Sequence, residues 1–305
     1  MGDEGKGRPI GPFRPEYAKI WIVIAIAAVS TAAILIKLSS SHPLTISFWR
    51  VLIAWLILLP FGLYRMRKPE ERPGLYLIFS MIFVGLALAL HFGMWIWSFQ
   101  YTKVSSSVLL VTTHPIFVAG ISYWLFKERL GRWAVVGIVL ALLGSAIIVG
   151  GDFSLEPSAL TGDLLSLGGS LMAGVYILSG SRFRKEVSLP VYAVFVYGSA
   201  AVFLLAAGIA IGVKLVVADH VEYIIFGGLA VGPMLAGHTI YNWALKYVSP
   251  TVVSVTLLGE PIGSTILALI LLAEAPYPGF YLGAPVVMAG IFMVARFSGR
   301  NRSGS

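Results

Sequence analysis

Two segments of this chain place an ionisable side chain directly before a proline within a long apolar run. The first, LLVTTHPIFV, contains His114 and Pro115, and the second, VTLLGEPIGS, contains Glu260 and Pro261. A proline inside a helix removes one backbone hydrogen bond and leaves the carbonyl four residues earlier without its donor. An imidazole or carboxylate beside such a break can bind a polar ligand or exchange a proton. The alternative is a packing kink, with a neutral histidine at a polar interface and a neutral, hydrogen-bonded glutamic acid.

Further polar and aromatic side chains share helix faces within the apolar runs. His91 and Trp95 are four residues apart, and His238 precedes Tyr241 and Asn242 by three and four residues. Residues at these spacings lie on one face of a helix. Such faces suit an amphipathic organic ligand, although aromatic packing alone explains them equally well.

Two more side chains complete the candidate site. Arg50 lies about two turns into the second apolar run, too deep to reach the membrane surface easily. It is either the partner of a substrate anion or a structural partner of a carbonyl or of Glu260. Tyr176 is the polar group expected from the sixth run. The predicted substrate-binding residues are Arg50, His91, Trp95, His114, Tyr176, His238, Tyr241, Asn242 and Glu260, and the predicted helix breaks are at Pro115 and Pro261.

The composition indicates which elements must position these residues. Of the 305 residues, 58% are hydrophobic and only 12% are charged, whereas a soluble domain has about 25% charged residues. The mean hydropathy of +0.87 reflects runs of roughly twenty apolar residues, the length at which a helix spans a bilayer. In lipid only helices and closed barrels satisfy the backbone, and these runs are too long for barrel strands. We therefore predict an all-α integral membrane protein.

Ten apolar runs predict ten transmembrane helices. They cover about residues 20–38, 44–64, 75–100, 104–126, 132–150, 162–181, 190–213, 221–246, 250–273 and 279–296. The connections are too short to fold as a soluble active-site domain. The absence of cysteine excludes disulfides and thiolate metal sites, and no zinc-protease, P-loop or nucleophile-elbow motif is present. We therefore expect no enzyme activity, no cofactor and no metal.

The positive charges predict the orientation of the helices. Of the 22 lysines and arginines, 18 fall in the two tails and the connections on their side, and two, Lys103 and Lys214, fall on the opposite side. The positive-inside rule then places both termini in the cytoplasm, with the protein in the cytoplasmic membrane. This asymmetry also accounts for the net charge of +8 without a nucleic-acid partner. The expected partners are the lipid bilayer and a small-molecule substrate, a coupling proton is one further candidate, and we expect a monomer.

The chain repeats itself at an offset of 146 residues. The identical pairs at this offset are Trp97/Trp243, Tyr101/Tyr247, Pro115/Pro261, Leu125/Leu271, Glu128/Glu274, Gly137/Gly283 and Gly144/Gly290. Several are rare residue types that hydrophobicity alone would not match, so the repeat indicates duplication. Each half has five spans, an odd number, and the halves therefore enter the membrane from opposite sides. Such inverted repeats are typical of secondary transporters, whose substrate binds near the midplane between the halves.

The repeat also divides the chain. We predict a cytoplasmic tail over 1–18, a first five-helix repeat over 19–150, an external connection over 151–161, a second repeat over 162–296 and a cytoplasmic tail over 297–305.

The order of these motifs resembles the drug/metabolite transporter superfamily, and in particular its ten-helix EamA-type members. The resemblance rests on ILIKLSSSHPLTISFWR between the first two spans, on the mid-helix proline of HPIFVAGISYWLFKE, and on EPIGSTILALILLAE in the second half. It covers nearly the whole chain. The resemblance implies a secondary exporter or exchanger of small metabolites, such as amino acids, and leaves the substrate open.

The functional prediction is therefore a secondary transporter of a small organic metabolite that works by alternating access around a central cavity. Glu260 is the first choice for coupling to a proton or cation. A membrane sensor or assembly protein that does not transport is one alternative, and the lack of a cavity between the halves would favour it. A lipid scramblase is another, for which we would expect a polar groove open to the bilayer.

Overall fold

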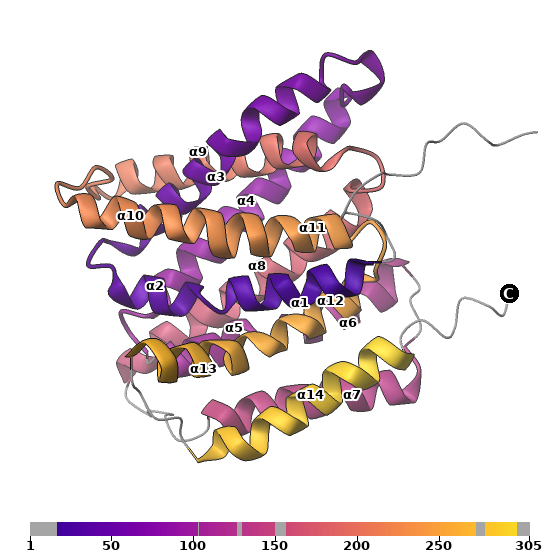
Figure 1. The fold of residues 1–305 in the computed structure, drawn as a ribbon. Helices are drawn as coiled ribbons and strands as arrows, with labels where there is room; N and C mark the ends of the chain where they lie inside the picture. Colours follow the sequence, from indigo (N-terminus) through magenta and orange to yellow (C-terminus); the bar gives the residue numbers. More distant parts are fainter. Residues whose placement is uncertain (1–16, 103, 127–129, 150–156, 273–277, 298–305) are drawn as a thin grey trace, which may run out of the picture.

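The fold is a bundle of helices that run in alternating directions and pack side by side (Figure 1). A computed structural model describes residues 17–102, 104–126, 130–149, 157–272 and 278–297. In these ranges nine helical segments are long and apolar enough to cross a membrane, and a tenth, Arg132–Ile148, is apolar but shorter. The predicted all-α membrane fold with ten spans is confirmed.

The first half contains α1 (Ala18–Val29), α2 (Ala32–Leu38), α3 (Pro43–Arg65), the short 3-10 turn η2 (Pro69–Glu71), α4 (Leu75–Ser98), α5 (Val104–Val111), α6 (His114–Phe126) and α7 (Arg132–Val149). The second half contains α8 (Pro157–Phe183), α9 (Leu189–Ala210), α10 (His220–Leu229), the π-helix η3 (Ala230–Thr239), α11 (Ile240–Ala244), α12 (Pro250–Thr256), the 3-10 turn η4 (Leu257–Gly259), α13 (Glu260–Leu272) and α14 (Gly279–Phe297).

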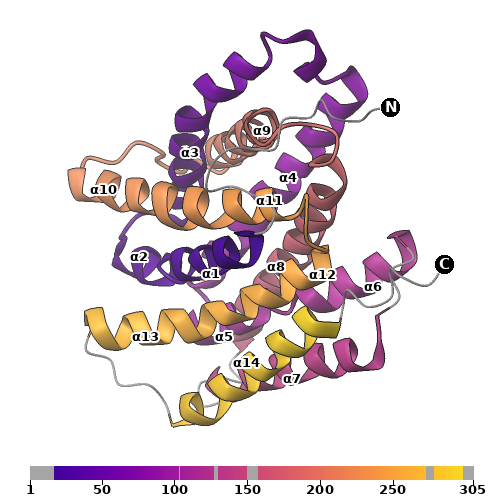
Figure 2. The same ribbon diagram turned by 45° about the vertical axis from the view of Figure 1, so that its right-hand side comes forward.

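The helices are stacked in rows from one side of the bundle to the other, and we call the two outer sides its edges. Figures 1 and 2 show α7 beside α14 at one edge and α3, α4 and α9 at the other, with the remaining helices between them. Helix α1 begins and α14 ends at the same end of the stack, as an even number of spans requires (Figure 1). We call this end, which also carries Arg65, Arg184 and Lys246, the basic end.

Local capping explains where several spans start. Ser249 accepts a hydrogen bond from the amide three residues on, and Pro250 occupies the first turn of α12. Asp219 caps α10 by accepting from the amide two residues on. The ring of His42 accepts a bond from the amide two residues on, just before Pro43 begins α3. Burial lowers the pKa of His42, which favours the neutral ring that this bond requires.

Two equivalent spans are interrupted at the same place in the repeat. Helix α5 ends at Val111 and α6 begins at His114, while α12 ends at Thr256 and α13 begins at Glu260 after the turn η4. At the offset of 146 residues, the bounds of α6 coincide with those of α13. In each case a proline is the second residue of the helix that follows, and its missing amide leaves the carbonyl four residues earlier without a helical donor.

Two other spans are less regular than the sequence predicts. The first, expected as one helix over 20–38, is interrupted at Ser30 and Thr31, whose hydroxyls donate to carbonyls four and three residues earlier. The eighth, expected as one helix over 221–246, contains η3, with Pro233 inside it. Pro233 has no amide hydrogen to donate to the carbonyl four residues back. The π-helix, with its wider turns, allows the span to continue past this residue.

Glycines bring α7 and α14 into backbone contact. A Cβ added at Gly137 would lie 2.8 Å from the carbonyl oxygen of Gly290, and one added at Gly144 would lie 2.8 Å from that of Gly283. At the repeat offset, Gly137 corresponds to Gly283 and Gly144 to Gly290. The repeat therefore converts the contact between Gly137 and Gly290 into the contact between Gly283 and Gly144. A self-complementary contact of this kind is what a two-fold axis between the halves produces.

The α7–α14 contact predicts a selective effect of alanine. Gly144→Ala should destabilise the protein by about 1–3 kcal/mol, because the new methyl group meets backbone atoms that cannot move independently. Gly120→Ala is the matched control, since nothing lies within 4 Å of its added Cβ. Thermal unfolding in detergent should show a lower melting temperature for Gly144→Ala alone. Equal melting temperatures for the two variants would contradict this packing.

Candidate functional site

A cavity lies between the two halves of the chain. All nine residues predicted to bind substrate line it: Arg50, His91, Trp95, His114, Tyr176, His238, Tyr241, Asn242 and Glu260. Two further lining residues, Val111 and Leu257, carry the carbonyls four residues before Pro115 and Pro261, which the sequence predicts to lack their helical donor. The sequence did not predict the other lining residues, which are Val29, Ala32, Thr112, Ala173, Ile177, Pro233 and Leu245. Most of these are ordinary apolar residues, and the structure alone distinguishes them from others in the same helices. The two repeat-related prolines, Pro115 and Pro261, are buried and do not belong to the lining.

Arg50 presents an unpaired positive charge to the cavity. It lies on α3, is 0% exposed, and stacks with its guanidinium carbon 4.0 Å from the ring centroid of Phe92. None of its three guanidinium nitrogens has a hydrogen-bond partner among the described residues. Burying a guanidinium costs desolvation free energy unless its N–H donors find hydrogen-bond acceptors. The site is therefore suited to an anionic group of a ligand.

Of the described residues that line the cavity, Glu260 is the one that is acidic. Its backbone amide donates to the carbonyl of Leu257 and closes the turn η4, which fixes the start of α13. Its own carbonyl accepts a weak hydrogen bond, of 3.4 Å, from the Ser30 hydroxyl. The carboxylate thus lies where the interruptions of two spans meet, in the same cavity as Arg50.

The helix break before Pro115 accounts for the neighbouring histidine. Pro115 cannot donate to the carbonyl of Val111, and the Nδ1 atom of His114 lies 3.2 Å from that oxygen instead. Since a carbonyl only accepts, Nδ1 carries the hydrogen and Nε2 is left with a lone pair. Nε2 of His114 is buried and has no partner among the described residues. His114 therefore satisfies the broken helix and offers a hydrogen-bond acceptor beside the cavity.

Stacked rings form an aromatic wall of the cavity. The rings of His91 and Trp95 are nearly parallel, 5.9 Å apart. His238 lies 6.1 Å from the ring of His91 and 6.1 Å from that of Tyr176. The Nδ1 atom of His91 is 2.9 Å from the carbonyl of Gly169, which fixes the ring and its tautomer as in His114.

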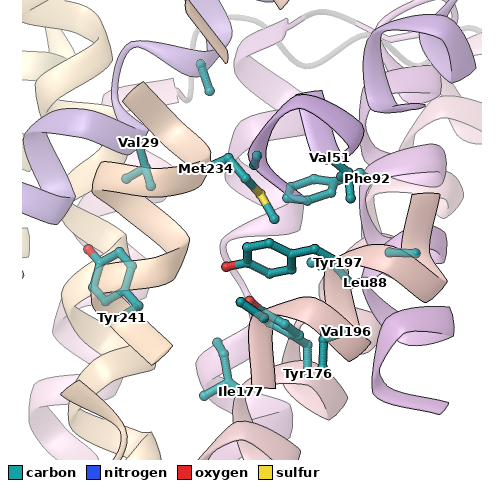
Figure 3. Packing of buried hydrophobic residues seen from close by; sticks show 14 of the residues in the cluster. Val29, Val51, Leu88, Phe92, Tyr176, Ile177, Val196, Tyr197, Met234 and Tyr241 are labelled. Atoms are coloured by element: carbon teal, nitrogen blue, oxygen red, sulfur yellow. The ribbon is translucent and has the colours of Figure 1, made fainter. Parts of the chain in front are cut away.

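A tyrosine network fixes the amide of Asn242. Its Nδ2 atom donates to the hydroxyl of Tyr176 and, at 3.4 Å, to that of Tyr197. Tyr197 is held in turn by Thr239, 2.9 Å away. Figure 3 shows Tyr176 and Tyr197 close together, with Tyr241 on a separate helix. Within the described part of the chain the Oδ1 atom of Asn242 has no partner, so the network leaves it as another free acceptor.

Membrane-spanning helices in two related halves, with a polar cavity between them, define the architecture of a membrane transporter. The profile of the EamA-like transporter family matches residues 17–150 and 160–296, so the chain belongs to that family, as its motifs suggested.

Named relatives agree with this assignment, and a solved structure shares the fold. An "Uncharacterized transporter" of Clostridium kluyveri is 24% identical over 287 residues, which cover 89% of this chain and 90% of the relative. The "Uncharacterized transporter YdfC" of Bacillus subtilis is 24% identical over 277 residues, which cover 88% and 87%. A crystal structure with 20% identity superposes with a TM-score of 0.78, covering 94% of this chain and 99% of that one, and has the same fold.

Proposed function

We propose that the protein is a secondary transporter that moves a small zwitterionic metabolite, such as an amino acid, by alternating access through the central cavity. The observation that carries this proposal is the placement of unpaired Arg50 and acidic Glu260 in the lining of one cavity. Arg50 would bind the carboxylate of the substrate. Glu260, with the acceptors of His114 and Asn242, would bind its ammonium group or a coupling proton.

The distribution of charge supports an orientation for this cycle. The basic end would face the cytoplasm, with both termini there and the protein in the cytoplasmic membrane. The protein would work as an exporter or exchanger and as a monomer, driven by a gradient of solute or protons. The two repeats, predicted over 19–150 and 162–296, would move relative to each other around the cavity.

Two alternative functions receive less support from the site. A sensor or assembly protein without transport has no need of a cavity lined by an unpaired arginine and a glutamate. A scramblase needs a polar groove that is open to lipid, whereas Arg50, His91 and Asn242 are buried between helices. Large apolar side chains such as Phe79, Ile224 and Phe292 are exposed instead, as lipid contact favours.

A flux experiment tests the proposed function. Purified protein in proteoliposomes preloaded with unlabelled amino acid should accumulate labelled amino acid by counterflow, without ATP. Amino-acid esters, which lack the carboxylate, should not compete, because they cannot pair with Arg50. Liposomes without protein provide the background. Flux indistinguishable from that background across the whole amino-acid panel would reject the proposed substrate class.

A further inference from the structure

Away from the cavity, at the end opposite the basic end, one carboxylate joins the two halves of the chain. Glu222, on α10, accepts four hydrogen bonds from the loop between α2 and α3. The donors are the hydroxyl of Ser39 at 2.5 Å, the amide and hydroxyl of Ser40 at 2.7 and 2.9 Å, and the hydroxyl of Ser41 at 2.8 Å. Bonds to an ionised acceptor are among the stronger ones in proteins. We call Glu222 and Ser39–Ser41 the clasp.

Neighbouring contacts extend the clasp along α3. The hydroxyl of Thr45 donates to the carbonyl of Lys214 at 3.0 Å, and the indole of Trp49 donates to that of Leu215 at 2.6 Å. Trp49 also stacks parallel to Phe226, with ring centroids 6.3 Å apart. The start of the second span is thus fastened to the connection before the eighth and to the eighth span itself.

The fastened helices are the ones that enclose the cavity. Helix α2 contributes Ala32 to the lining, α3 contributes Arg50, and the span that begins with α10 contributes Pro233 and His238. On its outer side the clasp borders a solvent-open depression of about 860 Å³, lined in part by Ser40, Ser41, His42, Lys214, Asp219 and Glu222. The clasp thus borders this depression on one side and fastens helices that line the cavity.

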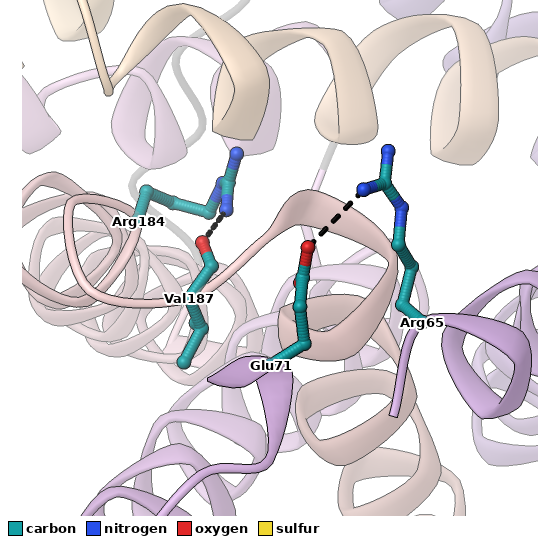
Figure 4. A network of polar contacts seen from close by, with 4 residues as sticks. All are labelled: Arg65, Glu71, Arg184 and Val187. Atoms are coloured by element: carbon teal, nitrogen blue, oxygen red, sulfur yellow. Dashed lines mark hydrogen bonds and ion pairs between the residues drawn. The ribbon is translucent and has the colours of Figure 1, made fainter. Parts of the chain in front are cut away.

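The repeat provides an internal comparison at the basic end. At the offset of 146 residues, Glu222 corresponds to Tyr76, which cannot replace a carboxylate, and the serine loop corresponds to residues 185–187. There Arg184 donates to the carbonyl of Val187 in its own connection, and Glu71 pairs with Arg65 in the neighbouring one, 3.1 Å apart (Figure 4).

The two ends are therefore closed differently. Among the described residues, no hydrogen bond joins the α3–α4 connection to the α8–α9 connection. Burial lowers the pKa of Arg184 to about 10. Because this value is still well above neutral pH, the side chain remains cationic. Its other bond, of 3.2 Å, goes to the backbone carbonyl of Asn242. The symmetric counterpart of the clasp thus has no hydrogen bond among the described residues, and Glu71 and Arg184 interact across it only through their opposite charges.

We propose that the clasp of Glu222 with Ser39–Ser41 is the gate that closes the cavity at the end opposite the basic end. In this structure the gate is closed, and its release opens the cavity to the outside. The inference rests on the alternating access of the proposed function, but it concerns which contacts hold one end shut. Transport then requires these four hydrogen bonds to break and re-form in every cycle.

Cysteine labelling tests the gate without measuring transport. The chain has no cysteine, so Ala173→Cys introduces a single thiol into the cavity lining. A membrane-impermeant maleimide is added to intact cells, and its rate of reaction is measured. Adding Glu222→Ala should raise this rate by about tenfold or more, because the closed state loses its fastening. Adding Glu71→Gln, at the basic end, should leave the rate unchanged. An unchanged rate with Glu222→Ala would overturn the gate.

A second variant replaces the hydrogen bonds of the clasp with a covalent link. The pair Ser40→Cys and Glu222→Cys, oxidised to a disulfide, should stop flux in proteoliposomes, and a reductant should restore it. Flux that persists in the oxidised protein would overturn the gate. The two proposals fail separately: faster labelling without any wild-type flux would reject transport alone, and wild-type flux with unchanged labelling would reject the gate alone.

Discussion

Replacing Arg50 with methionine is expected to abolish substrate binding while leaving the fold at least as stable as before. The guanidinium is fully buried, and its three nitrogens have no partner among the described residues. Loss of a buried charged hydrogen-bonding partner costs a complex about 2–5 kcal/mol, or roughly 30-fold to several thousandfold in affinity. Removal of an unpaired charge from a membrane interior relieves a desolvation cost. Binding and thermal unfolding of the same purified protein should therefore change in opposite senses.

A surface arginine is the matched control for this substitution. Arg65 is half-exposed and pairs with Glu71 at 3.1 Å, and such pairs contribute about 0–1 kcal/mol. Arg65→Met should alter neither affinity nor melting temperature appreciably. If Arg50→Met lowered the melting temperature and the remaining folded protein bound substrate normally, Arg50 would be a structural residue. That result would contradict its role as the partner of a carboxylate.

Glu260→Gln is expected to remove most of the substrate flux and most of its dependence on pH. The amide has nearly the same shape but cannot take up a proton or attract an ammonium group by charge, and no other acidic residue in the described part of the chain lines the cavity. Initial rates of counterflow between about pH 5.5 and 8.5 should be low and nearly constant in the variant, in contrast to the wild type.

The histidines of the cavity supply the competing explanation. His91, His114 and His238 line the same cavity and can also titrate. Glu71→Gln, at a partly buried site at the basic end and outside the cavity lining, controls for a general effect of losing a carboxylate. If Glu260→Gln kept a normal flux with an unchanged pH profile, Glu260 would have no part in coupling, and the pH dependence would belong to the histidines.

The sequence predicted the architecture because membrane helices follow simple physical rules. Span length and hydropathy are properties of each segment alone. The one-sided distribution of lysines and arginines can be counted along the chain without knowledge of the packing. The repeat then aligned Pro115 with Pro261, and ionisable residues at midplane depth were recognised by their cost in lipid. This reasoning brought together His91, on α4, and Asn242, on α11, without any knowledge of their packing.

Other features depend on contacts that a single sequence does not reveal. The break at Ser30 and the π-helix around Pro233 depend on which carbonyls neighbouring groups can satisfy. Glu222 could be placed at a membrane surface, but its bonds to Ser39–Ser41 join residues about 180 positions apart. A run of three serines beside a span, with an acidic residue on the same side, was the only available signal.

The pairing of Arg50 with a substrate carboxylate is the central claim, and a binding cycle tests it most directly. Affinities of an amino acid and of its methyl ester are measured by calorimetry for the wild type and for Arg50→Met. We expect the wild type to bind the ester at least about 30-fold more weakly than the acid, corresponding to roughly 2 kcal/mol. Arg50→Met should bind both with the same low affinity. If the variant still preferred the acid by the wild-type factor, the carboxylate would bind elsewhere and the account of this site would be wrong.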